Sequence, residues 1–468
     1  MLLATPPAAA HGFGQRFDLP LPLWLWITGA GATIVFTFLV VALFVGDRPL
    51  VATEAELRLR VPAVRWIGAA ARLTAVLLFI LTLCAGFFGL QDPYSNLITV
   101  MVWVIWWVGF AFACALIGDV WAVINPLRTL FQWAERAYGG LTGGGRLSRD
   151  FPYPPRLGAW PAVALFLCFA WTELVWRDKE VPLYIARVVL AYSVIAWTGM
   201  FVFGRDVWLA RGEAFSIAFG ILGRFAPLDT RRLSIRPPGA GLARAENVSF
   251  SLLVFVLLML SSVTFDGFLE TPLAERFRTA AQSSPMIARW LFALSERGLD
   301  ESQSITTAAL IAFAFGFLAA YWLASWLLVR LTRRWRPDLS VSDAACAFVL
   351  TLVPIAVTYH LSHYFSLLLT AGQFAIPLAS DPFGFGWNLF GTARYKVDLG
   401  VVSPYVFWYS AVTMIVLGHV IAVYLAHVAA LREFRSRQGA LVSQIPMLAL
   451  MVAYTMLSLW IFAQPIVG

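Results

Sequence analysis

The chain has 468 residues, of which 60% are apolar and 13% are charged. Soluble globular proteins are closer to half apolar and a quarter charged, so this composition excludes that class and indicates an integral membrane protein whose main partner is the lipid bilayer. The formal net charge is +8, but the arginines stand in loops between apolar runs, which favours a role in membrane orientation over nucleic-acid binding.

Residues 1–22 precede the first apolar run and are interpreted as an external arm or the remnant of a signal segment. Ala8–Ala10 before His11 match the small-residue end of a secretory signal, although the basic start and long apolar stretch of such a signal are missing. Cleavage after Ala10 would make His11 the terminal residue, whose amine and imidazole would chelate one copper ion. The alternative is an ordinary loop histidine.

Membrane-spanning helices need about 20 mostly apolar residues. The sequence predicts an all-α bundle with ten such spans in one domain over 23–466: 23–46, 66–90, 97–123, 158–176, 181–204, 247–267, 304–329, 343–370, 403–430 and 441–466. Residues 284–294 are apolar but too short to cross, so we expect them to lie in the interface or to re-enter the membrane.

The distribution of basic residues predicts the orientation. The loops at 47–65, 124–157, 205–246, 330–342 and 431–440 carry 23 of the 34 Lys and Arg residues, and the segments between them on the other side carry nine. Because basic loops remain in the cytoplasm, the sequence predicts that both termini lie outside.

Two histidines in the eighth span, His360 and His363, are candidate metal ligands. They are three residues apart, which places them about 60° apart on one helix face, where two imidazoles can meet one ion. They follow Pro354, which is expected to kink the span. The alternative is hydrogen bonding between helices. The hypothesis favours a divalent transition metal and does not distinguish zinc, copper, manganese and iron.

His419 lies near the middle of the ninth span, directly after Gly418. A buried histidine facing a neighbouring helix is commonly structural. The alternative is an axial haem ligand, since haem needs only such a ligand and a slot between helices. The chain has no CxxCH motif, so covalently attached haem is not supported.

Several carboxylates are expected near the outer face: Asp92, Glu173, Asp266, Glu270 and Asp381. Asp266 and Asp381 are the candidate catalytic residues. Together with His11, His360 and His363, these side chains would gather nitrogen and oxygen ligands at one depth in the membrane.

Six stretches carry a family resemblance: HGFGQRFDLPLP at 11–22, WLARGEAFSIAFGILGRFAP at 208–227, TFDG at 264–267, YHLSHYFSLLL at 359–369, SDPFGFGWNLFGTARYKVDLG at 380–400 and PMLALMVAYT at 446–455. The chain resembles bacterial membrane proteins known as fenitrothion hydrolases over nearly its whole length. The resemblance implies a multi-pass protein of the bacterial inner membrane, hydrolysis of an organophosphorus triester, and a second membrane subunit. It brings no established catalytic residues.

The leading hypothesis is therefore a metal-dependent membrane enzyme that acts on a small lipophilic substrate at the outer interface. One alternative is a copper- or haem-binding redox subunit resembling a monooxygenase. Another is a transporter or an assembly subunit of a membrane complex.

Overall fold

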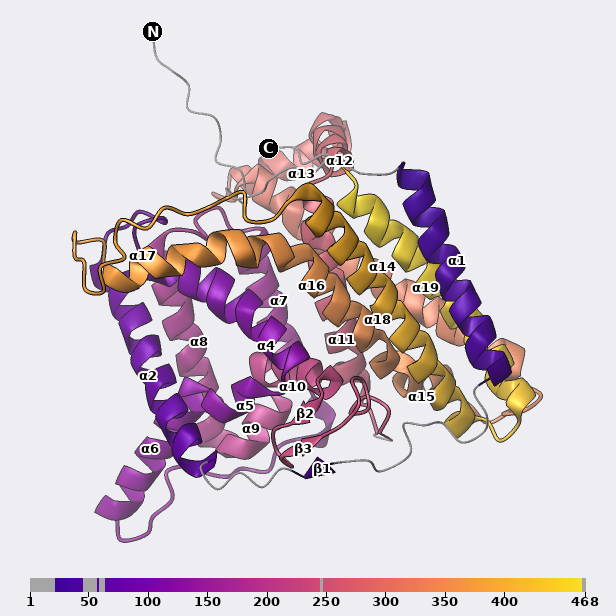
Figure 1. Ribbon diagram of the computed structural model, residues 1–468, viewed down its shortest axis with the longest axis horizontal. Helices are drawn as coiled ribbons and strands as arrows, with labels where there is room; N and C mark the ends of the chain where they lie inside the picture. Colours follow the sequence, from indigo (N-terminus) through magenta and orange to yellow (C-terminus); the bar gives the residue numbers. More distant parts are fainter. Residues whose placement is uncertain (1–21, 45–56, 59–63, 245–246, 465–468) are drawn as a thin grey trace.

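The computed structural model describes residues 22–44, 57–58, 64–244 and 247–464. Helices dominate these ranges (Figure 1), and their order along the chain is α1 (Leu23–Phe44), α2 (Val64–Phe88), α3 (Leu97–Thr99), η2 (Val100–Gly109), α4 (Phe110–Leu116), α5 (Val120–Ile124), α6 (Pro126–Leu141), η3 (Pro155–Leu157), α7 (Trp160–Leu174), α8 (Pro182–Phe203), α9 (Arg205–Arg211), α10 (Ala214–Phe225), α11 (Phe250–Leu269), α12 (Pro272–Ser283), α13 (Pro285–Ser295), α14 (Glu301–Thr332), α15 (Val341–Phe348), η4 (Val349–Leu352), α16 (Val353–Thr370), η5 (Ala371–Phe374), α17 (Ala375–Ser380), α18 (Pro404–Glu433) and α19 (Arg437–Phe462).

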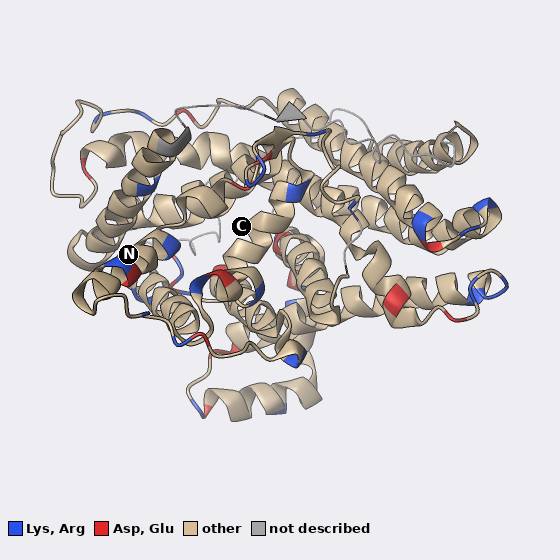
Figure 2. Cartoon of the chain, turned by 90° about the horizontal axis from the view of Figure 1, so that it is seen from below, with Lys and Arg blue, Asp and Glu red and all other residues tan. Residues whose placement is uncertain are grey.

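Ten helical segments in the described ranges are long and apolar enough to cross a membrane. They overlap the ten predicted spans one for one, which confirms the all-α, multi-pass architecture. Two boundaries differ from the prediction by more than four residues. The third segment ends at Leu116, before the separate short helix α5, and the eighth runs from Val341 to Ser380. Charged side chains stand mainly at helix ends and in loops, as Figure 2 shows from below.

The eighth segment is too long for a straight span. At about 1.5 Å per residue its 40 residues would extend about 60 Å, twice the hydrocarbon core of a bilayer. A 3₁₀ turn, η4, interrupts the helix just before Pro354, where the proline ring cannot continue regular hydrogen bonding. After η5, α17 lies across the top of α2 and α3 in Figure 1.

Helices α16 and α18 form the tightest pair in the bundle. A Cβ atom added to Gly418 on α18 would stand only 1.9 Å from Oγ1 of Thr358 on α16. Glycine at this position therefore allows the two backbones to approach closely, as small residues do in membrane bundles. This contact fixes the position of α16, which carries His360 and His363.

The third segment contains a ten-residue π-helix, η2. Such helices are rare, and they occur mostly as single-turn bulges, which are frequent at functional sites. Trp103, Trp106 and Trp107 lie in η2, which packs against α16 and η5.

The two ends of the bundle have different structures. At the lower end in Figure 1, β1 (Leu57–Arg58), β3 (Ser234–Ile235) and β2 (Leu228–Asp229) form a small antiparallel sheet. At the upper end, α12 and α13 form a hairpin outside the spans. The predicted short apolar stretch 284–294 corresponds to α13, which has 11 residues, whereas the neighbouring spans have 20 and 32.

Candidate functional site

A buried acid–imidazole pair joins α11 to α16. Oδ2 of Asp266 lies 2.9 Å from Nε2 of His363 and accepts a 2.7 Å hydrogen bond from the hydroxyl group of Tyr364. The side chain of Asp266 is 3% exposed and that of His363 is 14% exposed. Burial of a carboxylate costs several kcal/mol unless polar partners compensate for the lost water. The two contacts therefore hold Asp266 in one orientation.

Gly267, the residue directly after Asp266, leaves room for the ring of His363. A Cβ atom on Gly267 would lie 2.9 Å from Ile461, 3.2 Å from the hydroxyl oxygen of Tyr359 and 3.4 Å from Cε1 of His363. The rings of Tyr359 and His363 are parallel, with centroids 6.1 Å apart. The Thr-Phe-Asp-Gly motif thus supplies both the carboxylate and the space that α16 needs beside it.

His360 faces a different environment from His363. Its ring makes an edge contact with Trp107 of η2 at 5.4 Å and lies 4.7 Å from the ring of Tyr364. Nε2 of His360 is buried and has no hydrogen-bond partner in the part of the chain that the structure describes. Among the described contacts only His363 reaches Asp266, so the two histidines of α16 contact different neighbouring helices.

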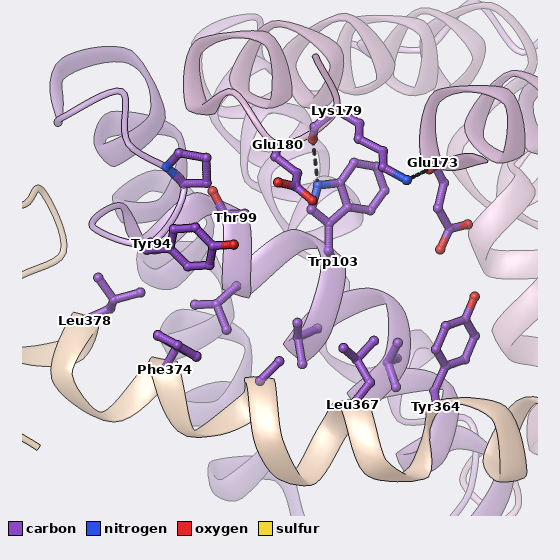
Figure 3. A pocket seen from close by; sticks show the side chains of 15 residues that line it. Tyr94, Thr99, Trp103, Glu173, Lys179, Glu180, Tyr364, Leu367, Phe374 and Leu378 are labelled. Carbon is purple, nitrogen blue, oxygen red and sulfur yellow. Dashed lines mark hydrogen bonds between the residues drawn. The ribbon is translucent and has the colours of Figure 1, made fainter. Parts of the chain in front are cut away.

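A small cavity with a mainly apolar wall lies beside this cluster, and we call it the small polar cavity after the three charged residues in that wall. It has a volume of about 90 Å³ and lies between η2, the end of α7, the turn before α8 and the α16–α17 segment. Tyr364 is part of its wall, and so are Glu173, Lys179 and Glu180 (Figure 3). Glu173 is within electrostatic range of both Asp266 and His363. The hydroxyl group of Tyr364 therefore connects the wall of the cavity to the buried pair.

Trp103 holds one side of the cavity in place. Its indole Nε1–H donates a 2.9 Å hydrogen bond to the carbonyl oxygen of Lys179. The ammonium group of Lys179 in turn donates a 2.8 Å bond to the carbonyl oxygen of Glu173. These bonds tie η2 to the α7–α8 turn, and Figure 3 shows Trp103 between Lys179 and the remaining wall.

The described side chains supply only part of a metal site. His363 Nε2 and Asp266 Oδ2 are donors that zinc, manganese, iron and copper accept. A catalytic zinc site, however, uses about three protein ligands, and no group of three His, Cys, Asp or Glu side chains suited to a metal occurs in the described ranges. A metal would need a donor from elsewhere. His11, the predicted brace residue, lies outside the described residues, so the metal stays a prediction.

The other two predicted site residues lie elsewhere. Both carboxylate oxygens of Asp381 accept backbone hydrogen bonds, from Phe385 at 2.9 Å and Gly386 at 2.6 Å, and these bonds stabilise the turn after α17. His419 is buried in α18, where its Nδ1 lies 2.8 Å from the carbonyl oxygen of Ile415. Haem binding at His419 and catalysis by Asp381 remain untested predictions.

Sequence reasoning gave little weight to three residues that line the cavity: Glu173, Lys179 and Trp103. In the sequence, Glu173 is one of five outer carboxylates, and Lys179 lies in the charged stretch 177–180 between two predicted spans. One signal was present in the sequence, because Lys179 is one of only two lysines in the chain. The role of Trp103 depends on the π-helix, which has no recognised sequence signature.

No family model matches this chain, and comparison with curated proteins and with solved structures likewise gives no match.

Proposed function

We propose that the protein is a membrane-embedded hydrolase that acts on a lipophilic ester at the small polar cavity. The observation that carries the proposal is the Tyr364 hydroxyl group, which connects the cavity wall to the buried Asp266–His363 pair. The resemblance to the fenitrothion hydrolases supports a phosphotriester as the substrate class. It also supports the bacterial inner membrane as the location and a second membrane subunit as a partner.

The wall of the cavity offers groups for each part of hydrolysis. Glu173 acts as the general base and takes a proton from a water molecule, whose oxygen forms a bond to phosphorus. The bond between phosphorus and the leaving oxygen breaks, its electron pair departs with that oxygen, and the proton on Glu173 is transferred to it. The ammonium group of Lys179 stabilises the negative charge that develops on the phosphoryl oxygen.

Asp266 and His363 are positioning residues in this scheme. Asp266 accepts the hydroxyl hydrogen of Tyr364, which lines the same cavity as Glu173. A bound metal, held by His363, Asp266 and a further donor such as His11, would add a Lewis acid to polarise the phosphoryl oxygen. The roles of Glu173 and Lys179 in hydrolysis do not depend on that metal.

The proposal is tested with detergent-purified protein and a dimethyl 4-nitrophenyl phosphotriester, by following release of nitrophenolate. Glu173→Gln removes the base while keeping the shape of the side chain, so kcat should fall about 10²- to 10⁴-fold. Glu296→Gln, which alters an exposed carboxylate in the turn after α13, is the control and should match the wild type. Equal rates for the wild type and both variants would reject Glu173 as the base.

The metal is tested on the same preparations. The metal-dependent hypothesis expects about one equivalent of a transition metal, lost in the His360→Ala, His363→Ala double variant. Zinc or manganese would support hydrolysis, whereas copper or iron would favour the redox alternative. A metal-free preparation that remains fully active, and that gains nothing from added metal, would contradict metal dependence.

A further inference from the structure

A second cavity adjoins the first and is much larger. It has a volume of about 630 Å³ and lies between α2, η2, α7 and α8. Trp103 and Lys179 belong to the walls of both cavities. The side chain of Trp103, held by its bond to Lys179, therefore stands at the boundary between them.

The two cavities differ in volume, so each has room for a different part of a ligand. Pockets for small organic ligands are about 300–1,000 Å³. The 90 Å³ cavity falls below this range and has room for only a few atoms, whereas the 630 Å³ cavity lies within it. A lipophilic ester that reacts beside Glu173 must therefore place most of its atoms elsewhere, and the adjoining cavity has the required volume.

The side chains in the wall of the large cavity are suited to binding an alkyl tail. Aliphatic and aromatic side chains such as Leu78, Phe79, Phe110 and Val189 form most of its wall. Its charged residues, Asp178 and Lys179, both lie in the α7–α8 turn. The wall follows α8 from Tyr184 to Ile195, about 16 Å at 1.5 Å per residue, so the space is elongated.

We infer that the 630 Å³ cavity binds the alkyl tail of an amphiphilic ester, whose reacting group lies past Trp103 in the small polar cavity. The substrate class is then a long-chain ester drawn from the bilayer, and compact esters are poor substrates. This inference rests on the proposed function and names its substrate.

Kinetics with a series of dialkyl 4-nitrophenyl phosphates test the tail site. Each buried methylene contributes about 0.8 kcal/mol, which equals about a fourfold gain in affinity. From methyl through butyl to octyl, kcat/KM referred to the free ester concentration in water should therefore rise about fourfold per methylene of the one bound chain until the cavity is filled. A flat series in the wild type would overturn the inference and leave the proposed hydrolysis intact.

Substitutions that fill the cavity provide the matched comparison. Ala75→Phe and Ala191→Phe place a ring in the large cavity and should abolish the chain-length dependence. Ala309→Phe makes the same change in a separate apolar cavity of about 760 Å³, which shares no wall residue with the small polar cavity. This control should keep the wild-type slope, and a slope lost equally in all three variants would contradict the assignment.

A binding experiment separates this inference from the proposed reaction. An octyl phosphotriester with a terminal diazirine, photolysed with the full-length protein in vesicles, should form adducts on α2, η2, α7 and α8, and excess octyl ester should reduce them. This result requires no turnover, so it would support the tail site even if hydrolysis were absent. Adducts on other helices would overturn the inferred tail site. Adducts that excess octyl ester does not reduce would also overturn it, because they would mean that a lipid occupies the large cavity.

Discussion

Tyr364 and Tyr359 are buried in the same helix, but their hydroxyl groups have different surroundings. The hydroxyl group of Tyr364 donates to Asp266, whereas that of Tyr359 has no hydrogen-bond partner among the described residues. A hydrogen bond to a charged group contributes about 1.5–3 kcal/mol, and an unpaired buried hydroxyl contributes nothing favourable. The two residues therefore form a matched pair for testing the buried cluster.

Replacement by phenylalanine should affect the two tyrosines differently. Tyr364→Phe should destabilise the protein by about 1–3 kcal/mol, because it leaves the buried carboxylate of Asp266 with one partner fewer. It should also lower kcat while leaving KM nearly unchanged. Tyr359→Phe should be neutral or slightly stabilising. Thermal unfolding in detergent measures both variants, and equal losses of stability would contradict the assigned hydrogen bond.

A second residue-scale prediction concerns Gly418. Gly418→Ala would place a methyl group 1.9 Å from Oγ1 of Thr358, and overpacking of this kind costs about 1–3 kcal/mol. The melting temperature should fall. Gly316→Ala, in α14, is the control, since a Cβ atom at Gly316 would have no neighbour within 4 Å and alanine is the better helix former. A normal melting temperature for Gly418→Ala would mean that α16 and α18 lie further apart.

At the scale of elements, one carboxylate stabilises the loop between α10 and α11. Partial burial acts to raise the pKa of Asp229, but hydrogen bonds from the backbone amides of Arg231 and Arg232 and the charge of Arg236 outweigh it, so the pKa lies below its usual value. The carboxylate lies 3.0 Å from the guanidinium group of Arg236. Asp229 thus stabilises the folded loop in its ionised form.

The lowered pKa predicts a pH dependence of stability. The contribution of Asp229 is complete above the pKa of an unfolded aspartate, about 4, and is lost as the pH falls through the lower pKa of the folded state. Asp229→Asn should therefore lower the melting temperature at neutral pH, and its difference from the wild type should shrink below about pH 4. Asp338→Asn removes an exposed carboxylate and should show no such trend. A difference that is independent of pH would contradict the ionised role.

The elements also show what the sequence can and cannot predict. Apolar length predicts the ten spans because a bilayer requires about 20 apolar residues of any helix that crosses it. Pro354 predicts the break in the eighth span for a local reason, the missing amide hydrogen of proline. The sequence predicts only that His363 and Asp266 lie at a similar depth in the membrane. Their contact depends on α11 packing beside α16. Glu173 acquires its position from a third helix, α7, and no local pattern reveals that arrangement.

At the scale of the whole molecule, the even number of spans in the described ranges places the start of α1 and the end of α19 at the same end of the bundle (Figure 1). The basic loops that the structure describes, at 124–157, 205–244, 330–342 and 431–440, lie at the opposite end. The wall of the small polar cavity includes Pro93 and Lys179, from turns that lie between the basic loops in the chain, so the positive-inside rule predicts that this cavity opens toward the outer face. This orientation would admit substrates from the outer leaflet.

Cysteine labelling in spheroplasts tests the orientation. In a variant without the four native cysteines, Ser283→Cys on α12 should react with a membrane-impermeant maleimide from outside. Gly140→Cys, in α6 at the basic end, should react only after permeabilisation. The opposite labelling pattern would invert the topology and place the small polar cavity on the cytoplasmic side.

The scarcity of lysine gives the molecule a built-in chemical reporter. The chain has two lysines: Lys179 lies in the walls of both cavities, and Lys396 lies in an exposed loop. An amine-directed acylating reagent therefore meets one lysine inside the ligand compartment, which consists of the two adjoining cavities, and one outside it. The acylation of Lys396 serves as an internal standard, and the ratio of the two modified peptides in a mass spectrum reports how fully the compartment is occupied. A screen of lipid extracts by this ratio would find ligands without any assay of turnover.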